Sequence, residues 1–230
     1  MKNTIECINC KEENPLYRLT CLKCNSFLRS RIYNINLFQT IAELFESPVS
    51  TFKNIIYSDH KNFIIWLTIL MSIKFALISF QVKNIFTEGK YSITVLFTSS
   101  FSSLLIFAAF LILIALLITI LNYVLGLKTR FKDNYSIYIY SFVPQIISLI
   151  ILFPVEIALY REYWFTFNPS PFVIKPTVTY FLFAIEGIMI AWSLLLLIFA
   201  TYAQSRNKLY STLVGLIIGL AYFLTIILTL

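Results

Sequence analysis

The chain has 230 residues, of which 59% are hydrophobic and 13% are charged, and its mean hydropathy is +0.81. Soluble domains carry about a quarter charged residues, so this composition excludes an ordinary soluble globular protein. The net charge of +7 does not indicate a nucleic-acid-binding protein. Residues 1–62 hold eight Lys or Arg against six Asp or Glu, and the remaining excess lies in short loops beside apolar tracts.

All four cysteines lie near the N-terminus, in two C-x2-C pairs that ten residues separate. This spacing is typical of a zinc ribbon, in which each pair forms a tight turn and the intervening segment folds back as a hairpin. Four thiolates complete a tetrahedral shell, so we expect a structural and not a catalytic zinc. The predicted ligands of the Zn²⁺ ion are Cys7, Cys10, Cys21 and Cys24.

A pair of disulfides is the alternative for these cysteines. A cytoplasmic N-terminus would place them in a reducing compartment, which favours zinc. Asn25 fits the left-handed backbone that often follows such a pair, whereas Lys11 fits it less well. Residues 1–32 are therefore predicted to form a zinc-ribbon-like module, whose fold depends on the metal because so short a segment builds little core.

Residues 33–62 are expected to form two short amphipathic helices, which lie along the inner leaflet or pack against the membrane helices. Apolar residues recur at helical spacing in 37–45, and Asn36 is placed to cap the first helix. Ser47 is placed to cap the second helix, which begins at Pro48. A partner-binding groove is the alternative to plain packing. His60, the only histidine, is expected to be solvated near the headgroups.

Five tracts approach or exceed the roughly 20 apolar residues that a membrane-spanning helix needs. The second lies within 37 uncharged residues, but its middle contains no Pro, Gly or charge to form a turn, so one long tilted helix is predicted. The sequence thus predicts an all-α polytopic membrane protein with a membrane domain at 63–230. The predicted spans are residues 63–80, 95–123, 135–159, 178–203 and 209–230.

The distribution of basic residues predicts that the N-terminus lies in the cytoplasm and the C-terminus on the opposite side. This topology puts thirteen Lys or Arg inside, in residues 1–62 and in the loops at 128–132 and 206–208, and four outside. Dividing the second tract into two spans would weaken this bias. No secretory signal is visible, so the first span is expected to act as an uncleaved anchor.

Three charged residues, Lys74, Glu156 and Glu186, fall in or near the hydrocarbon region. A charge at the bilayer centre is costly unless it is paired or hydrated. We expect Lys74 to pair with Glu186 or to extend toward the interface, and Glu156 to reach the interface at the end of its span. A structural ion pair and a polar pathway or ligand pocket both remain open.

The stretch "NLFQTIAELFESPVSTFKNI", followed by five apolar tracts, resembles the Yip1-domain family. The resemblance implies a cytosolic N-terminal region, five membrane helices and a proline-containing amphipathic lead-in, which Pro48 and Phe52 match. Tyr138, Tyr140 and Pro144 match the family's Tyr-rich stretch followed by proline. An N-terminal zinc ribbon resembles the form of many bacterial members, which implies a bacterial cytoplasmic membrane. The eukaryotic branch implies small GTPases and vesicle traffic, but no GTPase contact motif matches, so that role is not carried over.

No catalytic constellation is visible, since the chain has one histidine and no phosphate-binding glycine loop among its five glycines. We therefore expect that the protein is not an enzyme. The leading hypothesis is a Yip1-like scaffold or adaptor that organises membrane lipids or a protein partner at the cytosolic face, and a homo-oligomer is compatible with it. The alternative is a small transporter or channel that uses the charged residues within the spans.

Overall fold

The computed structural model describes residues 3–30 and 33–229, with the backbone alone for residues 97–100. The predicted boundary at 32–33 and the last residue of the fifth predicted span lie outside these residues. Within the described residues, five helices are long and apolar enough to cross a membrane, which confirms the predicted fold class. These helices are Ile64–Phe86, Phe101–Val124, Phe131–Tyr160, Pro176–Ser205 and Lys208–Leu228.

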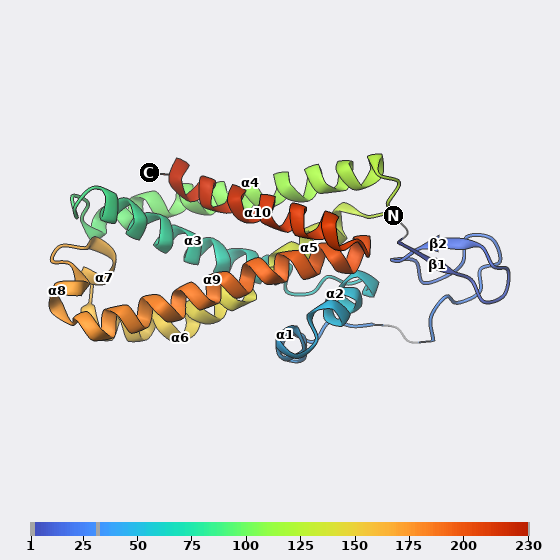
Figure 1. Cartoon of the computed structure of the whole chain (residues 1–230), viewed down its shortest axis with the longest axis horizontal. Coiled ribbons are helices and arrows are strands. Elements are labelled where there is room, and N and C mark those ends of the chain that lie inside the picture. The colour runs from blue at the N-terminus through green and yellow to red at the C-terminus, as the bar shows by residue number, and fades with distance from the viewer. Residues whose placement is uncertain (1–2, 31–32, 230) are drawn as a thin grey trace. The chain divides into compact units, whose positions relative to one another are not determined.

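The N-terminal head, defined here as residues 3–30, is a small two-stranded module that contains all four cysteines. Strands β1 (Thr4–Glu6) and β2 (Glu13–Pro15) pair in antiparallel fashion, with Ile5 opposite Asn14 (Figure 1). The buried core of the head is small and consists of Cys7, Cys21 and Leu28. So little apolar burial provides only a small part of the stability that a folded module needs.

Two amphipathic helices follow the head, as the periodicity predicted. In α1 (Leu37–Glu46), the Asn36 side chain accepts a hydrogen bond of 3.3 Å from the Gln39 amide and so caps the helix. In α2 (Pro48–Tyr57), Pro48 occupies the first position, but the Ser47 side chain makes no capping hydrogen bond. Helix α2 buries Phe52 completely and packs on α5 (Phe131–Ser141). Helix α1 packs on α2 in turn, so α2 connects the pair to the membrane domain.

Most of the membrane helices are a few residues longer than the predicted spans, and two differences are larger. Helix α3 (Ile64–Phe86) extends six residues beyond the predicted end, so Lys83 lies in its last turn and not in a loop. The third span consists of α5 and α6 (Val143–Tyr160), which are separated at Phe142 because Pro144 has no amide hydrogen for a continuous helix. The second tract forms one helix, α4 (Ile93–Val124), as predicted.

The last two membrane helices are α9 (Pro176–Ser205) and α10 (Lys208–Leu228). The connection between α6 and α9 contains two short helices, α7 (Tyr163–Thr166) and α8 (Pro171–Ile174). Unlike the basic connections after α4 and α9, this connection is rich in aromatic residues, and Trp164 and Phe165 within it are buried.

The chain forms two compact units. Unit 1 contains Met1–Ile64, Leu111–Ser141 and Leu195–Ile218, and unit 2 contains Ile65–Phe110, Phe142–Leu194 and Gly219–Leu230. Helices α4, α9 and α10 each contribute residues to both. Unit 1 thus contains every loop that the sequence predicts inside, and unit 2 contains both loops that the sequence predicts outside.

Part of the core of unit 2 is a cluster of aromatic side chains. The ring of Phe107 lies 5.3 Å from that of Phe75, 5.8 Å from that of Phe142 and 6.4 Å from that of Tyr222. The Tyr222 hydroxyl donates a hydrogen bond of 3.0 Å to Gln145 Oε1, so the one polar atom in this cluster is satisfied. The cluster joins α3, α4, α6 and α10.

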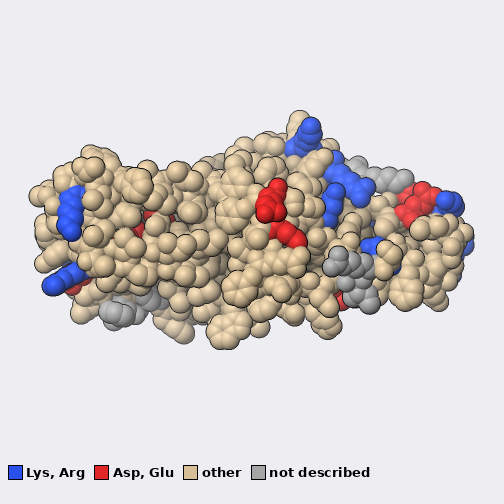
Figure 2. All heavy atoms as spheres, turned by 90° about the horizontal axis from the view of Figure 1, so that it is seen from below, with Lys and Arg blue, Asp and Glu red and all other residues tan. Residues whose placement is uncertain are grey.

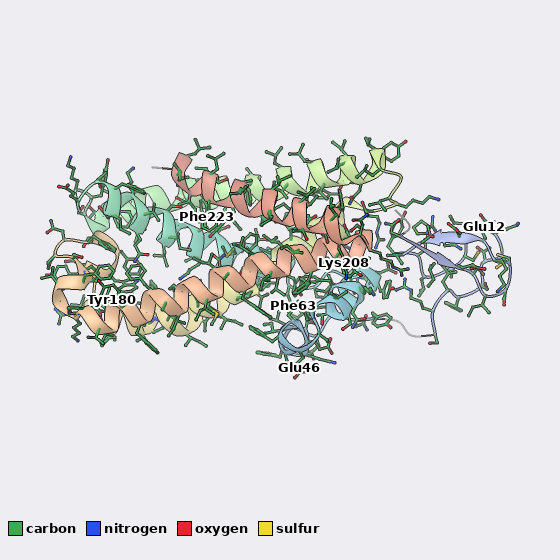
Figure 3. All side chains as sticks on the ribbon, viewed as in Figure 1. Glu12, Glu46, Phe63, Tyr180, Lys208 and Phe223 are labelled. Carbon is green, nitrogen blue, oxygen red and sulfur yellow. The ribbon has the colours of Figure 1, made fainter. Side chains whose placement is uncertain are left out.

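The outer faces of the membrane helices are apolar. Tyr180 of α9 and Phe223 of α10 are exposed examples, and both side chains are visible in Figure 3. On the face shown in Figure 2, most of the surface carries neither basic nor acidic side chains. Exposed apolar surface on this scale is expected where helices contact lipid.

Candidate functional site

The four cysteine sulfur atoms lie within 4.8 Å of one another. Cys7 Sγ is 3.6 Å from Cys24 Sγ, and Cys10 Sγ is 3.5 Å from Cys21 Sγ. A tetrahedral zinc ion with Zn–S bonds of about 2.3 Å separates its sulfur ligands by about 3.8 Å. A disulfide would require about 2.05 Å, and all four cysteines are free. The arrangement therefore fits a metal site and not the disulfide alternative.

The two cysteine pairs have the same backbone geometry. The Lys11 amide donates to the Cys7 carbonyl at 3.0 Å, and the Asn25 amide donates to the Cys21 carbonyl at 3.1 Å. Lys11 and Asn25 both have left-handed backbones, with φ of 58° and 57°. Lys11 therefore adopts the left-handed conformation that suits lysine less well than asparagine, because the turn requires it at a small steric cost.

Two polar side chains that the sequence analysis did not single out contact the sulfur atoms. The Ser26 hydroxyl lies 3.2 Å from Cys7 Sγ and 3.0 Å from Cys24 Sγ. The buried Asn14 side chain donates to Cys21 Sγ at 3.5 Å, while its oxygen accepts from the Leu22 amide at 2.9 Å. Such contacts orient metal ligands. In the sequence, only their closeness to the cysteine pairs distinguishes these two residues from other serines and asparagines.

Hydrogen bonds and burial change the pKa of three of the four thiols: those of Cys7 and Cys21 are lowered and that of Cys10 is raised. The Ser26 hydroxyl and the Cys10 amide hydrogen-bond to the Cys7 sulfur and lower the pKa of that thiol to about 6. A thiol with a pKa of about 6 is mostly thiolate at neutral pH, and the thiolate is the form that binds a metal. At Cys10 the Glu12 amide lowers the pKa, but burial and the hydrogen bonds to the other three sulfur atoms outweigh it and raise the pKa to about 12. The contacts within the head thus favour the thiolate at Cys7 and Cys21 and disfavour it at Cys10.

The head is joined to the rest of unit 1 by polar and aromatic contacts. Asn3 exchanges two hydrogen bonds with the backbone of Lys128, at 3.2 and 3.4 Å. The Arg130 guanidinium lies 4.3 Å from the centre of the Tyr17 ring, and that of Arg29 lies 4.2 Å from the centre of the Tyr57 ring. Such cation–π contacts contribute about 0.5–1 kcal/mol each at exposed sites.

Within unit 2, Lys74 of α3 and Glu186 of α9 form an ion pair, with Nζ and Oε1 2.6 Å apart. The Ser148 hydroxyl of α6 lies 2.9 Å from Oε1 and 3.0 Å from Oε2 of Glu186. The pairing of Lys74 with Glu186 is one of the two arrangements that the sequence left open. Ser148 was not foreseen, because nothing in its local sequence distinguishes it from other serines in spans.

Glu156 is 2% exposed, so its side chain is buried within the protein. Helix α6 continues to Tyr160, so Glu156 lies a full turn before the helix end and its side chain stays between helices. It lines a cavity of about 240 Å³ together with Lys74 and Glu186. The structure therefore brings the three predicted residues to one place in unit 2, and a role for that place remains a prediction.

The residues that carry the family resemblance have structural positions. Pro48 begins α2, and Phe52 is fully buried on it. Tyr138 and Tyr140 are fully buried on α5, and the Tyr140 hydroxyl donates to the Asn62 carbonyl at 3.1 Å. Pro144 is the second residue of α6, directly after the break at Phe142. These residues thus lie at helix starts or in the buried core.

Comparison with known proteins agrees with the architecture. The family model of the Yip1 domain matches residues 42–229, which begin within α1 and include all the membrane helices. A search of curated proteins and a search of solved structures found no match. The protein is an integral, multi-pass membrane protein that belongs to the Yip1 domain family.

Proposed function

We propose that the protein is a membrane scaffold or adaptor. A structural zinc ion stabilises the fold of its head, and the head binds a protein partner at the cytosolic face. The membrane helices anchor this head and contact lipids. The observation that carries the proposal is the pattern of exposed apolar residues on the two cysteine turns.

Zinc is the metal that the donor set favours. Four thiolates at tetrahedral spacing are typical of structural zinc sites, and hard cations such as Mg²⁺ and Ca²⁺ prefer oxygen ligands. With all four positions occupied by Cys7, Cys10, Cys21 and Cys24, no position remains for a substrate. The zinc therefore acts in folding, and the protein is proposed to work without catalysis.

Each cysteine turn presents one exposed aliphatic side chain. Ile8 follows the first cysteine of its pair and is 78% exposed, and Leu22 holds the equivalent position in the second pair and is 55% exposed. Phe27 in the same module is 68% exposed. Apolar side chains held on rigid turns lose little entropy on binding, which suits them to contact an apolar partner surface.

The proposed orientation follows from the basic loops. Unit 1 contains the head and the basic connections after α4 and α9, where Lys128, Lys132, Arg206 and Lys208 are exposed. Basic residues beside membrane spans favour the cytoplasmic side and attract anionic headgroups. The head would then face the cytoplasm, in a bacterial cytoplasmic membrane, where its cysteines stay reduced for metal binding.

Cross-linking in intact membranes tests the docking role. Ile8→Asp should abolish a cross-linked partner that the unchanged protein recovers, because a carboxylate is costly to bury in an apolar contact. Asn9→Asp adds the same charge to the neighbouring exposed position of the same turn and should preserve the partner. Equal recovery with both variants would remove the docking role from the turns. The mass of the product also separates a second copy of the chain from a different protein.

A small transporter or channel is the second candidate function, favoured by the cavity that Lys74, Glu156 and Glu186 line. In reconstituted vesicles, this function predicts a flux of small ions or solutes that Glu186→Gln abolishes. Absence of flux from the unchanged protein would exclude it.

A further inference from the structure

The cavity in unit 2 contains two carboxylates and one ammonium group. Helix α3 contributes Lys74, α6 contributes Glu156, and α9 contributes Glu186. The rest of the lining is mostly apolar and aromatic. The cavity has a volume of about 240 Å³, which is large enough for several water molecules or one small polar group.

Glu186 is already satisfied within the protein. Its carboxylate accepts from Lys74 at 2.6 Å and from the Ser148 hydroxyl at 2.9 and 3.0 Å. The charge of Lys74 is therefore balanced by Glu186, and both stay in place without any further group.

Glu156 differs from Glu186, because Lys74 is the one basic residue among the described residues that line the cavity, and it is already paired with Glu186. The Glu156 side chain is buried beside Lys74, Glu186 and Trp164, which all interact with the carboxyl group, but Oε1 makes no hydrogen bond to any residue that the structure describes. A buried carboxylate oxygen without a donor is costly, so an ordered group in the cavity that supplies a donor and a positive charge would stabilise it.

We propose that this cavity binds a primary ammonium group, which donates to Glu156. A metal cation fits less well, because Ca²⁺ and Mg²⁺ need about six oxygen ligands and the lining offers two carboxylates, one of them already paired. A primary ammonium needs only three acceptors, fewer than either metal ion.

Two sources provide this group: the headgroup of an ethanolamine lipid and a free amine such as ethanolamine. Glu156 lies one turn before the end of α6, and the cavity includes Trp164 of α7 beyond that end, so part of the lining belongs to the region where lipid headgroups lie. The inference concerns unit 2 and does not depend on the docking role proposed for the head.

Lipid retention by the full-length protein tests the inference. The protein is purified from membranes into nanodiscs that contain equal amounts of phosphatidylethanolamine and phosphatidylcholine, and the lipid bound to it is measured by native mass spectrometry. The two headgroups carry the same charge, but the methylated one has no N–H donors. We expect a preference for phosphatidylethanolamine of about tenfold, as one charge-assisted hydrogen bond provides.

Glu156→Gln should reduce this preference to near unity, whereas Glu88→Gln, at an exposed acid of the same unit, should retain it. If neither lipid is preferred, ethanolamine is titrated into phosphatidylcholine nanodiscs, and saturable binding that Glu156→Gln abolishes assigns the site to a free amine. No preference and no binding, or a preference that Glu156→Gln leaves unchanged, would overturn the proposal. If Glu156→Gln does not fold, the comparison of the two lipids and of ethanolamine with the unchanged protein still decides the outcome. Partner capture by the head is a separate measurement, so the two proposals fail independently.

Discussion

Lys61 and Asp133 form an ion pair in which neither side chain is exposed to solvent. Lys61 Nζ lies 2.9 Å from Asp133 Oδ1, and the two side chains are 0% and 1% exposed. The same ammonium donates to the carbonyls of Ile55 and Ile56 near the end of α2. Lys61 thus satisfies the end of α2 and fixes it to α5. Burial lowers the pKa of Lys61, and Asp133 offsets only part of that effect.

Asp133→Asn should destabilise unit 1, because it leaves the buried Lys61 without a counter-charge and removes the carboxylate that Arg130 also contacts at 2.9 Å. The free energy of unfolding should fall by about 3–5 kcal/mol, measured by denaturation in mild detergent. The double variant Lys61→Met with Asp133→Asn should recover part of this loss. A double variant that is as unstable as the sum of the single ones would show that the two residues are not coupled.

Asn14→Ala should weaken metal binding while leaving the four ligands unchanged. Asn14 is fully buried and joins Cys21 Sγ to the Leu22 amide, so its loss frees one cysteine to reorient. Zinc affinity should fall about 10- to 100-fold in competition with a chelator. Asn9→Ala, at an exposed position of the first turn, is the control and should bind as tightly as the unchanged protein. Equal affinity of both variants would contradict the orienting role of Asn14.

Gly215→Ala and Gly219→Ala form a matched pair on α10. A Cβ at 215 would lie 2.6 Å from Ile198 Cγ1 and 3.0 Å from the Ile198 backbone, whereas a Cβ at 219 would meet only the end of the Leu194 side chain. Gly215→Ala should therefore cost about 1–3 kcal/mol of stability, and Gly219→Ala less, because a leucine end can move aside. Thermal unfolding of the two purified variants compares them. A larger loss for Gly219→Ala would be inconsistent with this packing.

Reporter fusions test the proposed orientation. A green fluorescent protein fused to the N-terminus should fluoresce, and an alkaline phosphatase fused after Leu230 should be active, because the phosphatase folds only outside the cytoplasm. Removing the positive charges of Lys128, Arg130 and Lys132 should reduce this bias. An inactive phosphatase at the C-terminus together with a fluorescent C-terminal fusion would place both ends inside and contradict an odd number of spans.

The features that the sequence predicts well depend on local pattern. The five spans are long apolar runs, and the metal cluster follows from two C-x2-C pairs, so neither needs knowledge of distant contacts. The pairing of Lys61 with Asp133 joins residues 72 positions apart, and no local pattern marks either one. The same holds for Ser148 beside Glu186 and for the burial of Glu156, which depends on where α6 ends and on what packs beside it. The sequence does not predict the last six residues of α3, because polar residues such as Gln81 and Asn84 end the apolar tract. The helix continues past them, since their side chains donate to the Trp164 and Phe165 carbonyls.

The most direct test of the proposed function is photo-cross-linking from position 22 in intact membranes. A photoreactive phenylalanine analogue in place of Leu22 should give a discrete adduct with one protein partner, and a zinc chelator that enters the cytoplasm should abolish the adduct because the head loses its fold. The same analogue in place of the exposed Phe38 of α1 controls for random collisions. An adduct that persists unchanged after zinc is removed, or the absence of any adduct specific to position 22, would contradict a zinc-stapled docking head.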